Sequence, residues 1–164
     1  MPVPNQIVWP SRYEPASCPV HVRNQLSILS PPESVWAWII RAQLWPTWYP
    51  NSANIRFLNG QPPDLALGTR FRWKTFGVTL LSRVLELVPY ERLAWEAHAN
   101  GLDAYHVWLV QKTDLGCDVI TEETERGWLA RIGKALRPKR LEQQHQIWLE
   151  GLRAKATVGL PPVP

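Results

Sequence analysis

The alternation of apolar and polar residues predicts a series of β-strands between residues 20 and 125. From residue 20 to 29, apolar residues such as Val20, Val22 and Leu26 alternate with polar ones, and this period of two is typical of a half-buried strand. Residues 70–75 repeat the pattern, with Phe71 and Trp73 on one face. Further strand-like runs occupy residues 55–59, 78–88, 92–99, 105–112 and 117–125. The short turns between them predict an antiparallel meander.

Helical patterns occur after the first strand and at the end of the chain. Ser30, followed by two prolines and Glu33, predicts a helix start, and a short aromatic helix or turn then ends at Pro50. After residue 127 the apolar period becomes 3.6. The helical stripes comprise Trp128, Leu129, Ile132 and Leu136 before Pro138, and Leu141, His145, Trp148 and Leu152 after it. We expect this long C-terminal helix to cover the apolar face of the sheet.

Proline content sets the first 19 residues apart. Five prolines lie between positions 2 and 19, and each removes a backbone donor, so we expect an irregular arm without regular helix or strand. Trp9 and Tyr13 are expected to dock this arm on the body. Residues 20–157 are interpreted as a single domain, and residues 158–164 as a flexible tail.

Composition narrows the class of protein. The 164 residues suit one domain, and ten tryptophans indicate either a bulky core or an aromatic ligand site. The net charge of +4 permits a loose attraction to anions without establishing one. Cys18 and Cys117 lack metal-ligand spacing, and no signal peptide or membrane span is recognisable. We therefore expect a cytoplasmic protein with no metal, no cofactor, no bound nucleic acid and no stable membrane insertion.

Several local phrases resemble the START-like (SRPBCC) superfamily, especially its bacterial polyketide cyclase/dehydrase-like branch. They are Trp45-Pro-Thr-Trp48-Tyr-Pro50, Gly68-Thr-Arg-Phe71-Arg-Trp73, Ser82-Arg-Val84-Leu-Glu86-Leu-Val-Pro89, Arg92-Leu-Ala-Trp95, His106-Val-Trp108, Gly116-Cys-Asp-Val-Ile-Thr121-Glu-Glu123 and Leu136-Arg-Pro138. The resemblance covers roughly residues 20–155. It implies an α+β helix-grip fold, in which a seven-stranded antiparallel sheet wraps around a long C-terminal helix, with two short helices after the first strand. It also implies an internal cavity for lipids, polyketides or other apolar molecules.

The candidate ligand-binding residues lie on the strand faces opposite the charged side chains, and on the covering helices. They are Trp48, Tyr49, Phe71, Trp73, Val84, Trp95, His106, Trp108, Thr121, Glu123, His145 and Trp148. The resemblance favours His106, Trp108 and Val110 as the inward residues of their strand. Tyr105, Val107 and Leu109 alternate almost as well, so the sequence leaves this register open. The expected cavity volume is about 300–1,000 Å³.

His106 and Glu123 are the candidate acid and base. Their strands are joined by the turn at residues 114–116, which pairs position 106 with position 124, give or take one. Burial would raise the pKa of the Glu123 carboxyl and leave it partly protonated near neutral pH. Alternatively, His106 and His145 are satisfied core residues, and Glu123 is an exposed acid beside Glu122 and Glu125.

Three functions follow from these features. The first is binding of a hydrophobic small molecule without catalysis, because cavity walls are recognisable but no assembled catalytic set is. The second is a cyclase or dehydratase that uses His106 and Glu123. The third is association with anionic membranes through residues 128–140, in which an apolar stripe lies on the opposite side of the helix from Arg and Lys. The same stripe is expected to cap the sheet, which counts against the third function.

Overall fold

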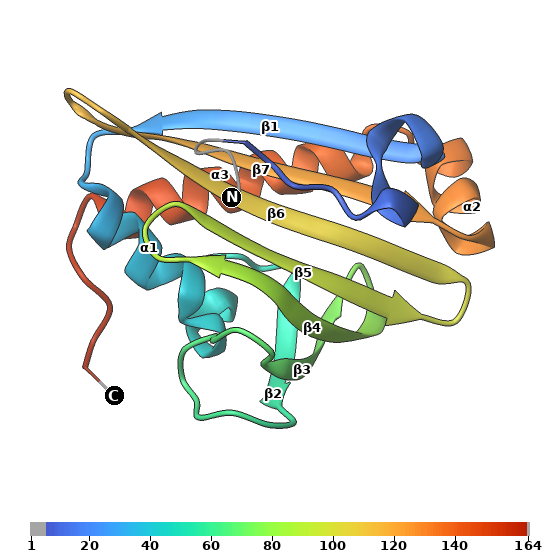
Figure 1. Cartoon of the computed structure of the whole chain (residues 1–164), viewed down its shortest axis with the longest axis horizontal. Coiled ribbons are helices and arrows are strands. Elements are labelled where there is room, and N and C mark those ends of the chain that lie inside the picture. Colours follow the sequence, from blue (N-terminus) through green and yellow to red (C-terminus); the bar gives the residue numbers. More distant parts are fainter. Residues whose placement is uncertain (1–5, 164) are drawn as a thin grey trace.

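The structure is a computed structural model that describes residues 6–163. Seven strands form one sheet, and the α-helices follow β1 and β7 (Figure 1). The strands are β1 (Val20–Ile28), β2 (Ser52–Phe57), β3 (Arg70–Thr75), β4 (Val78–Val88), β5 (Arg92–Ala99), β6 (Leu102–Thr113) and β7 (Gly116–Arg126). The helices are η1 (Ser11–Tyr13), η2 (Pro15–Ser17), α1 (Pro32–Ile40), η3 (Ala42–Thr47), α2 (Trp128–Leu136) and α3 (Arg140–Ala156).

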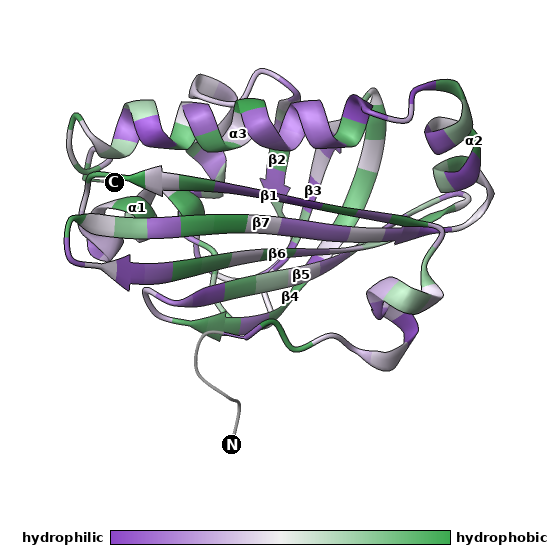
Figure 2. Ribbon diagram, turned by 90° about the horizontal axis from the view of Figure 1, so that it is seen from above, coloured by the Kyte–Doolittle hydropathy of each residue, from purple (hydrophilic) through white to green (hydrophobic). Residues whose placement is uncertain are grey.

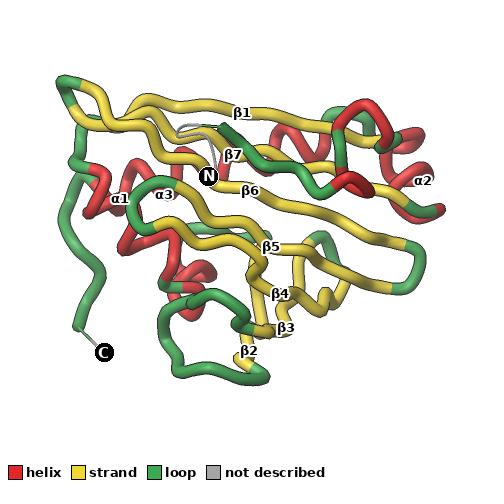
Figure 3. The backbone as a smooth tube through the Cα atoms, viewed as in Figure 1, coloured by secondary structure: helices red, strands yellow, loops and turns green. Residues whose placement is uncertain are grey.

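All neighbouring strands are antiparallel, and their order is β1-β7-β6-β5-β4-β3-β2. Five consecutive hairpins build β2 to β7, and β1 then joins the free edge of β7, as the tube drawing shows (Figure 3). The helix α3 crosses one face of the curved sheet (Figure 2). This arrangement confirms the predicted helix-grip fold.

The inner face of the sheet packs against α1, η3 and α3 through tryptophans. Trp45, Trp95, Trp108 and Trp148 are almost completely buried, and their rings contact one another. The Trp45 and Trp95 rings stack with centroids 5.4 Å apart. Such aromatic packing buries large areas per residue, so much of the interior is a solid core.

The N-terminal arm covers the part of the outer face that β6 and β7 form. Tyr13 is buried and stacks on Tyr105 of β6 at a centroid distance of 5.3 Å, and Thr124 donates a hydrogen bond to the Tyr13 carbonyl. Trp9 also contacts Tyr105. In the described part of the arm, residues 6–19, the regular structure consists of the single 3-10 turns η1 and η2. The prediction for residues 1–5 lies outside the described residues.

Helix α2 differs from the prediction. The stripe of Trp128, Leu129, Ile132 and Leu136 was expected to cap the sheet. Leu129 is partly buried, but the other three side chains are exposed. Ala130, on the opposite side of the helix, is buried instead. The break at Pro138 is the physical reason, because it lets α2 leave the axis of α3. Among residues 6–163, no helix has the length and apolarity needed to span a bilayer.

The C-terminal segment contacts α1. Trp38 donates a hydrogen bond of 2.7 Å to the carbonyl oxygen of Gly159, and Arg41 donates one to the carbonyl oxygen of Pro162. Pro161 is buried. The limits of the predicted domain and tail stay predictions.

Candidate ligand-binding cavity

A cavity of about 240 Å³ lies at the α2 end of the interior. Its walls come from the inner face of the sheet, from α2 and from the first half of α3. The volume falls below the expected range of 300–1,000 Å³. The tryptophan cluster explains the difference, because it fills the other half of the space between the sheet and α3.

Seven of the twelve predicted ligand-binding residues line the cavity. They are Tyr49, Trp73, Trp95, His106, Glu123, His145 and Trp148. The other five, Trp48, Phe71, Val84, Trp108 and Thr121, do not line it, and their assignment as ligand-binding residues stays a prediction. All five are buried in or beside the core. They point inward as predicted, but an inward side chain can equally well fill a core.

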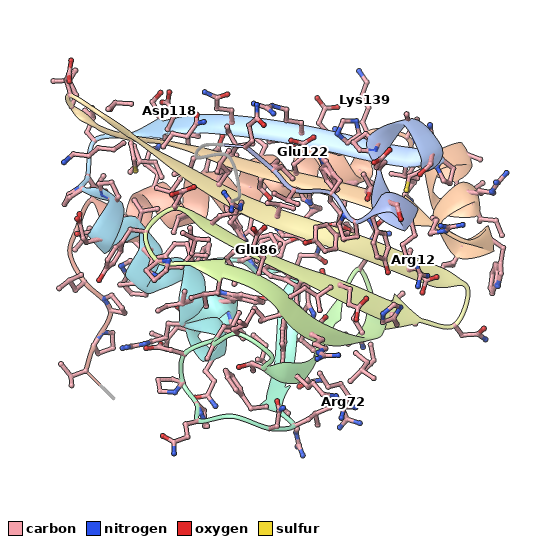
Figure 4. All side chains as sticks on the ribbon, in the orientation of Figure 1. Arg12, Arg72, Glu86, Asp118, Glu122 and Lys139 are labelled. Carbon is pink, nitrogen blue, oxygen red and sulfur yellow. The ribbon has the colours of Figure 1, made fainter. Side chains whose placement is uncertain are left out.

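The structure settles the register that the sequence left open. His106, Trp108 and Val110 lie on the inner side of β6, whereas Tyr105 and Val107 lie on the outer side beneath the arm. His106 pairs directly with Glu123 across β6 and β7. The neighbouring acid Glu122 points to the opposite face, where it contacts His21 and Arg23 (Figure 4).

A buried polar cluster of His106, Glu123 and His145 forms one wall of the cavity. The Oε2 atom of Glu123 lies 2.6 Å from Nδ1 of His106 and 3.2 Å from Nε2 of His145. The hydroxyl of Thr121 lies 3.1 Å from the remaining ring nitrogen of His106. The His106 ring stacks on Trp95 at a centroid distance of 4.5 Å. One carboxylate oxygen therefore accepts from two imidazoles that come from β6 and α3.

The pKa of Glu123 is lowered, which corrects the prediction that this residue is partly protonated. Burial alone would raise it, but the hydrogen bonds from His106 and His145 outweigh burial and favour the carboxylate. A different acid has a raised pKa: Glu125, which lies two residues further along the inner face of β7. Burial and the negative charge of Glu123 both raise the pKa of Glu125 well above its ordinary value.

These shifts define the protonation of the cluster. Burial lowers the pKa of His106, so its ring is neutral near pH 7 and donates from Nδ1 to the Glu123 carboxylate. Glu125, whose pKa is raised by burial and by the charge of Glu123, lines the same cavity. The site thus holds an ionised carboxylate, a second carboxyl with a raised pKa and two imidazoles, a set that could bind a hydroxyl or carbonyl group or move a proton.

Sequence reasoning missed several residues at the α2 end of the cavity. They are Leu102, Ala104 and Glu125 on the strands, and Leu129, Gly133, Lys134, Arg137 and Arg140 in α2, in α3 and between them. The strand residues could have been found, because the alternation that turns His106 and Glu123 inward also turns Ala104 and Glu125 inward. The helix residues could not, because their position depends on the break at Pro138.

Two contacts hold α2 and α3 where they line the cavity. The Arg140 guanidinium lies over the Phe76 ring, 5.0 Å from its centroid, and Lys134 donates a hydrogen bond of 2.6 Å to the Pro19 carbonyl. Tyr49 stacks on Trp148 at 4.4 Å, and burial raises the pKa of Tyr49 to about 12, so its phenol is neutral.

The same cluster is the candidate metal site of the described chain. Three possible ligand atoms lie within 4.8 Å of one another, one each from His106, Glu123 and His145. Two imidazoles and a carboxylate are ligands that zinc or iron accept. Here Glu123 already accepts hydrogen bonds from both imidazoles, so the geometry does not require an ion, and Nδ1 of His145 is buried without a partner among the described residues. The sequence-based prediction that no metal binds stays a prediction.

Comparisons with known proteins agree with this architecture. The profile of the family described as "Activator of Hsp90 ATPase homolog 1-like protein" matches residues 30–154. The hypothetical protein jhp0584 from Helicobacter pylori is 31% identical, with a TM-score of 0.86, and the match covers 95% of this chain and 99% of that one. No curated protein matches this chain.

More distant structures share the fold alone. TTHA0849 from Thermus thermophilus is 16% identical, with a TM-score of 0.69 over 85% of this chain and 98% of that chain. The di-domain aromatase/cyclase StfQ from the steffimycin biosynthetic pathway is 14% identical, with a TM-score of 0.70 over 85% of this chain and 51% of that chain. With the match over residues 30–154 and a seven-stranded helix-grip fold, the chain belongs to the Activator of Hsp90 ATPase homolog 1-like family of the SRPBCC superfamily.

Proposed function

We propose that the protein binds a small aromatic molecule that carries a hydroxyl or carbonyl group. The observation that supports this most directly is the composition of the cavity wall. Trp73, Trp95 and Trp148 supply apolar surface, and the cluster around Glu123 supplies polar groups at one place. A mostly apolar pocket with a few converging polar groups is the common form of a small-molecule site.

The size of the cavity limits the ligand. An apolar protein cavity of about 150 Å³ can hold benzene. The 240 Å³ found here therefore suits a molecule of one or two fused rings rather than a long acyl chain or a sterol. The structural neighbour StfQ is named as an aromatase/cyclase from the steffimycin biosynthetic pathway, which agrees with a ring-containing ligand.

A filling substitution tests this proposal. Ala104 is buried on the inner face of β6 and lines the cavity, so Ala104→Leu extends a side chain into the space. We expect it to weaken the binding of 2-naphthol at least about tenfold, since the ring loses the volume it occupies. Titration calorimetry measures the affinity, and native mass spectrometry of the purified wild type identifies any molecule that copurifies.

The matched control is Ala154→Leu on the exposed side of α3, outside the cavity wall. It adds the same atoms and should leave the affinity unchanged. Equal affinity of wild type and Ala104→Leu for every one-ring and two-ring phenol tried would count against binding in this cavity.

A second candidate function is acid–base catalysis on the bound molecule. It is favoured by the 2.6 Å contact between His106 and Glu123, which places a donor and an acceptor in hydrogen-bond reach beside the cavity. His106→Asn and Glu123→Gln would separate the two functions. Lost turnover of a copurifying molecule at unchanged affinity supports catalysis, whereas lost affinity without any turnover in the wild type supports binding alone.

A further inference from the structure

The exposed stripe of α2 has no counterpart elsewhere on the described helices. Trp128, Ile132 and Leu136 are 57%, 48% and 76% exposed, and their spacing of four places them on one face of the helix. The residue opposite them, Ala130, is buried against the body of the protein. Ile132 and Leu136 therefore point away from the fold, and the exposed Trp128 ring lies beside them against Gly101.

This orientation is the reverse of that in an ordinary surface helix. A helix on a soluble domain turns its apolar stripe to the core and its polar side to water. In α3 this rule holds, since Trp148, Leu149 and Leu152 are buried. In α2 only Ala130 is buried, although the helix is more strongly amphipathic than α3. Three adjacent large apolar side chains in water indicate a surface that a partner covers.

The charges around the stripe define the chemistry of that partner. Residues 126–141 contain six cationic side chains and no acidic one. They are Arg126, Arg131, Lys134, Arg137, Lys139 and Arg140. Arg131 and Lys139 are exposed. The partner must accept an apolar stripe that contains a tryptophan, and it must also accept the cations around that stripe. An anionic bilayer offers both, because its negative headgroups lie over an apolar layer.

The position of α2 permits such a contact. The helix lies at one end of the molecule, beyond the end of α3 (Figure 2), and Lys139 lies at the same end (Figure 4). The adjacent side of α2 lines the cavity through Leu129 and Gly133. One short helix thus contacts solvent with its exposed stripe and the cavity with the neighbouring side.

We propose that α2 docks the protein on the surface of anionic membranes. Trp128, Ile132 and Leu136 enter the boundary between headgroups and acyl chains, and the surrounding arginines and lysines contact lipid phosphates. The contact is interfacial, since α2 has nine residues and no described helix can cross a bilayer. It also places the cavity wall next to the bilayer, where apolar molecules concentrate.

Two other partners fit less well. A groove on another protein would accept the stripe but gives no reason for sixteen residues without an acid. Nucleic acid would accept the cations and could stack a base on Trp128, but it leaves the exposed Ile132 and Leu136 without a role. The combination of both features favours the lipid surface.

Vesicle sedimentation tests the proposal. We expect the full-length protein to bind vesicles made of equal parts phosphatidylglycerol and phosphatidylcholine, and to bind pure phosphatidylcholine at least about tenfold more weakly. Raising the salt from about 0.1 M to about 0.5 M should weaken the binding several-fold, because the Debye length shortens. The double variant Ile132→Gln, Leu136→Gln should lower binding at least about tenfold, since both side chains leave the apolar layer.

The matched control is Leu115→Gln, which changes a leucine that is 79% exposed in the β6–β7 turn, at the other end of the molecule (Figure 1). Thermal unfolding of each variant checks that the fold is kept. The proposal is overturned if the wild type does not bind anionic vesicles, or if the α2 variant binds them as Leu115→Gln does. The cavity variant Ala104→Leu should bind vesicles like the wild type, so failure of the ligand proposal and failure of the membrane proposal are distinguishable.

Discussion

The two halves of the space between the sheet and the C-terminal helices are built differently. In the half beneath η3 and the middle of α3, Trp45, Trp108 and Trp148 interlock with no room for a ligand. In the half beneath α2, the strands present the paired alanines Ala97 and Ala104, and a cavity remains. The same sheet therefore carries a core at one end and a pocket at the other. The size of the inward side chains decides which one forms.

The largest expected effect is on the filled half. Trp148→Ala should lower the free energy of unfolding by about 3–5 kcal/mol, because it removes a fully buried ring and leaves a cavity. Trp128→Ala is the control, since Trp128 is more than half exposed and should cost less than about 1 kcal/mol. Urea unfolding measures both. Similar losses for the two variants would mean that the tryptophan core does not stabilise the fold as described.

The polar wall of the hollow half should make stability depend on pH in two directions. The lowered pKa of Glu123 stabilises the fold above the ordinary carboxyl range, and this contribution is lost as the pH falls. The raised pKa of Glu125 acts the opposite way, because its buried carboxyl favours the protonated form and destabilises the fold as the pH rises through that pKa.

We therefore expect opposite effects from two amide substitutions. Glu123→Gln should lower the free energy of unfolding by about 1–3 kcal/mol at pH 7, because the charged acceptor of two buried imidazoles becomes a neutral amide oxygen, which forms weaker hydrogen bonds. Glu125→Gln should raise it by about 1 kcal/mol at pH 8 and by less at pH 5. Unfolding curves at pH 5, 7 and 8 compare the two. A gain from Glu125→Gln that is the same at pH 5 and pH 8 contradicts the assignment of the raised pKa.

The smallest expected effect concerns the helix that borders the hollow half. A Cβ atom added at Gly133 of α2 would meet no atom within 4 Å, so Gly133→Ala should stabilise the protein by about 0.5–1 kcal/mol through helix propensity. Gly101→Ala should destabilise it, because its φ is +77° and its Cβ would lie 2.2 Å from the Trp128 ring. Thermal unfolding distinguishes the two variants. Destabilisation by Gly133→Ala would contradict the open space that the structure has beside Gly133.

The sequence by itself determined the sheet, its antiparallel order and the long C-terminal helix. Period-two alternation and turn residues act over a few positions, so they can be read without knowing the tertiary structure. The pairing of His106 with Glu123 also followed from the position of one turn, to within one residue. The family phrases added the curvature of the sheet around the helix.

Only the tertiary structure decided where the interior is filled and what its acids do. The alternation along the strands predicts that both Trp108 and Trp95 point inward, yet of these two only Trp95 lines the cavity. Whether the space beside an inward residue is filled depends on the side chains of η3 and α3 that pack against its strand. The ionisation of Glu123 depends on His145, which lies 22 residues away along the chain and on another element. The outward face of α2 depends on the direction the chain takes after Pro138. Each of these is a property of contacts between distant segments, which no local pattern contains.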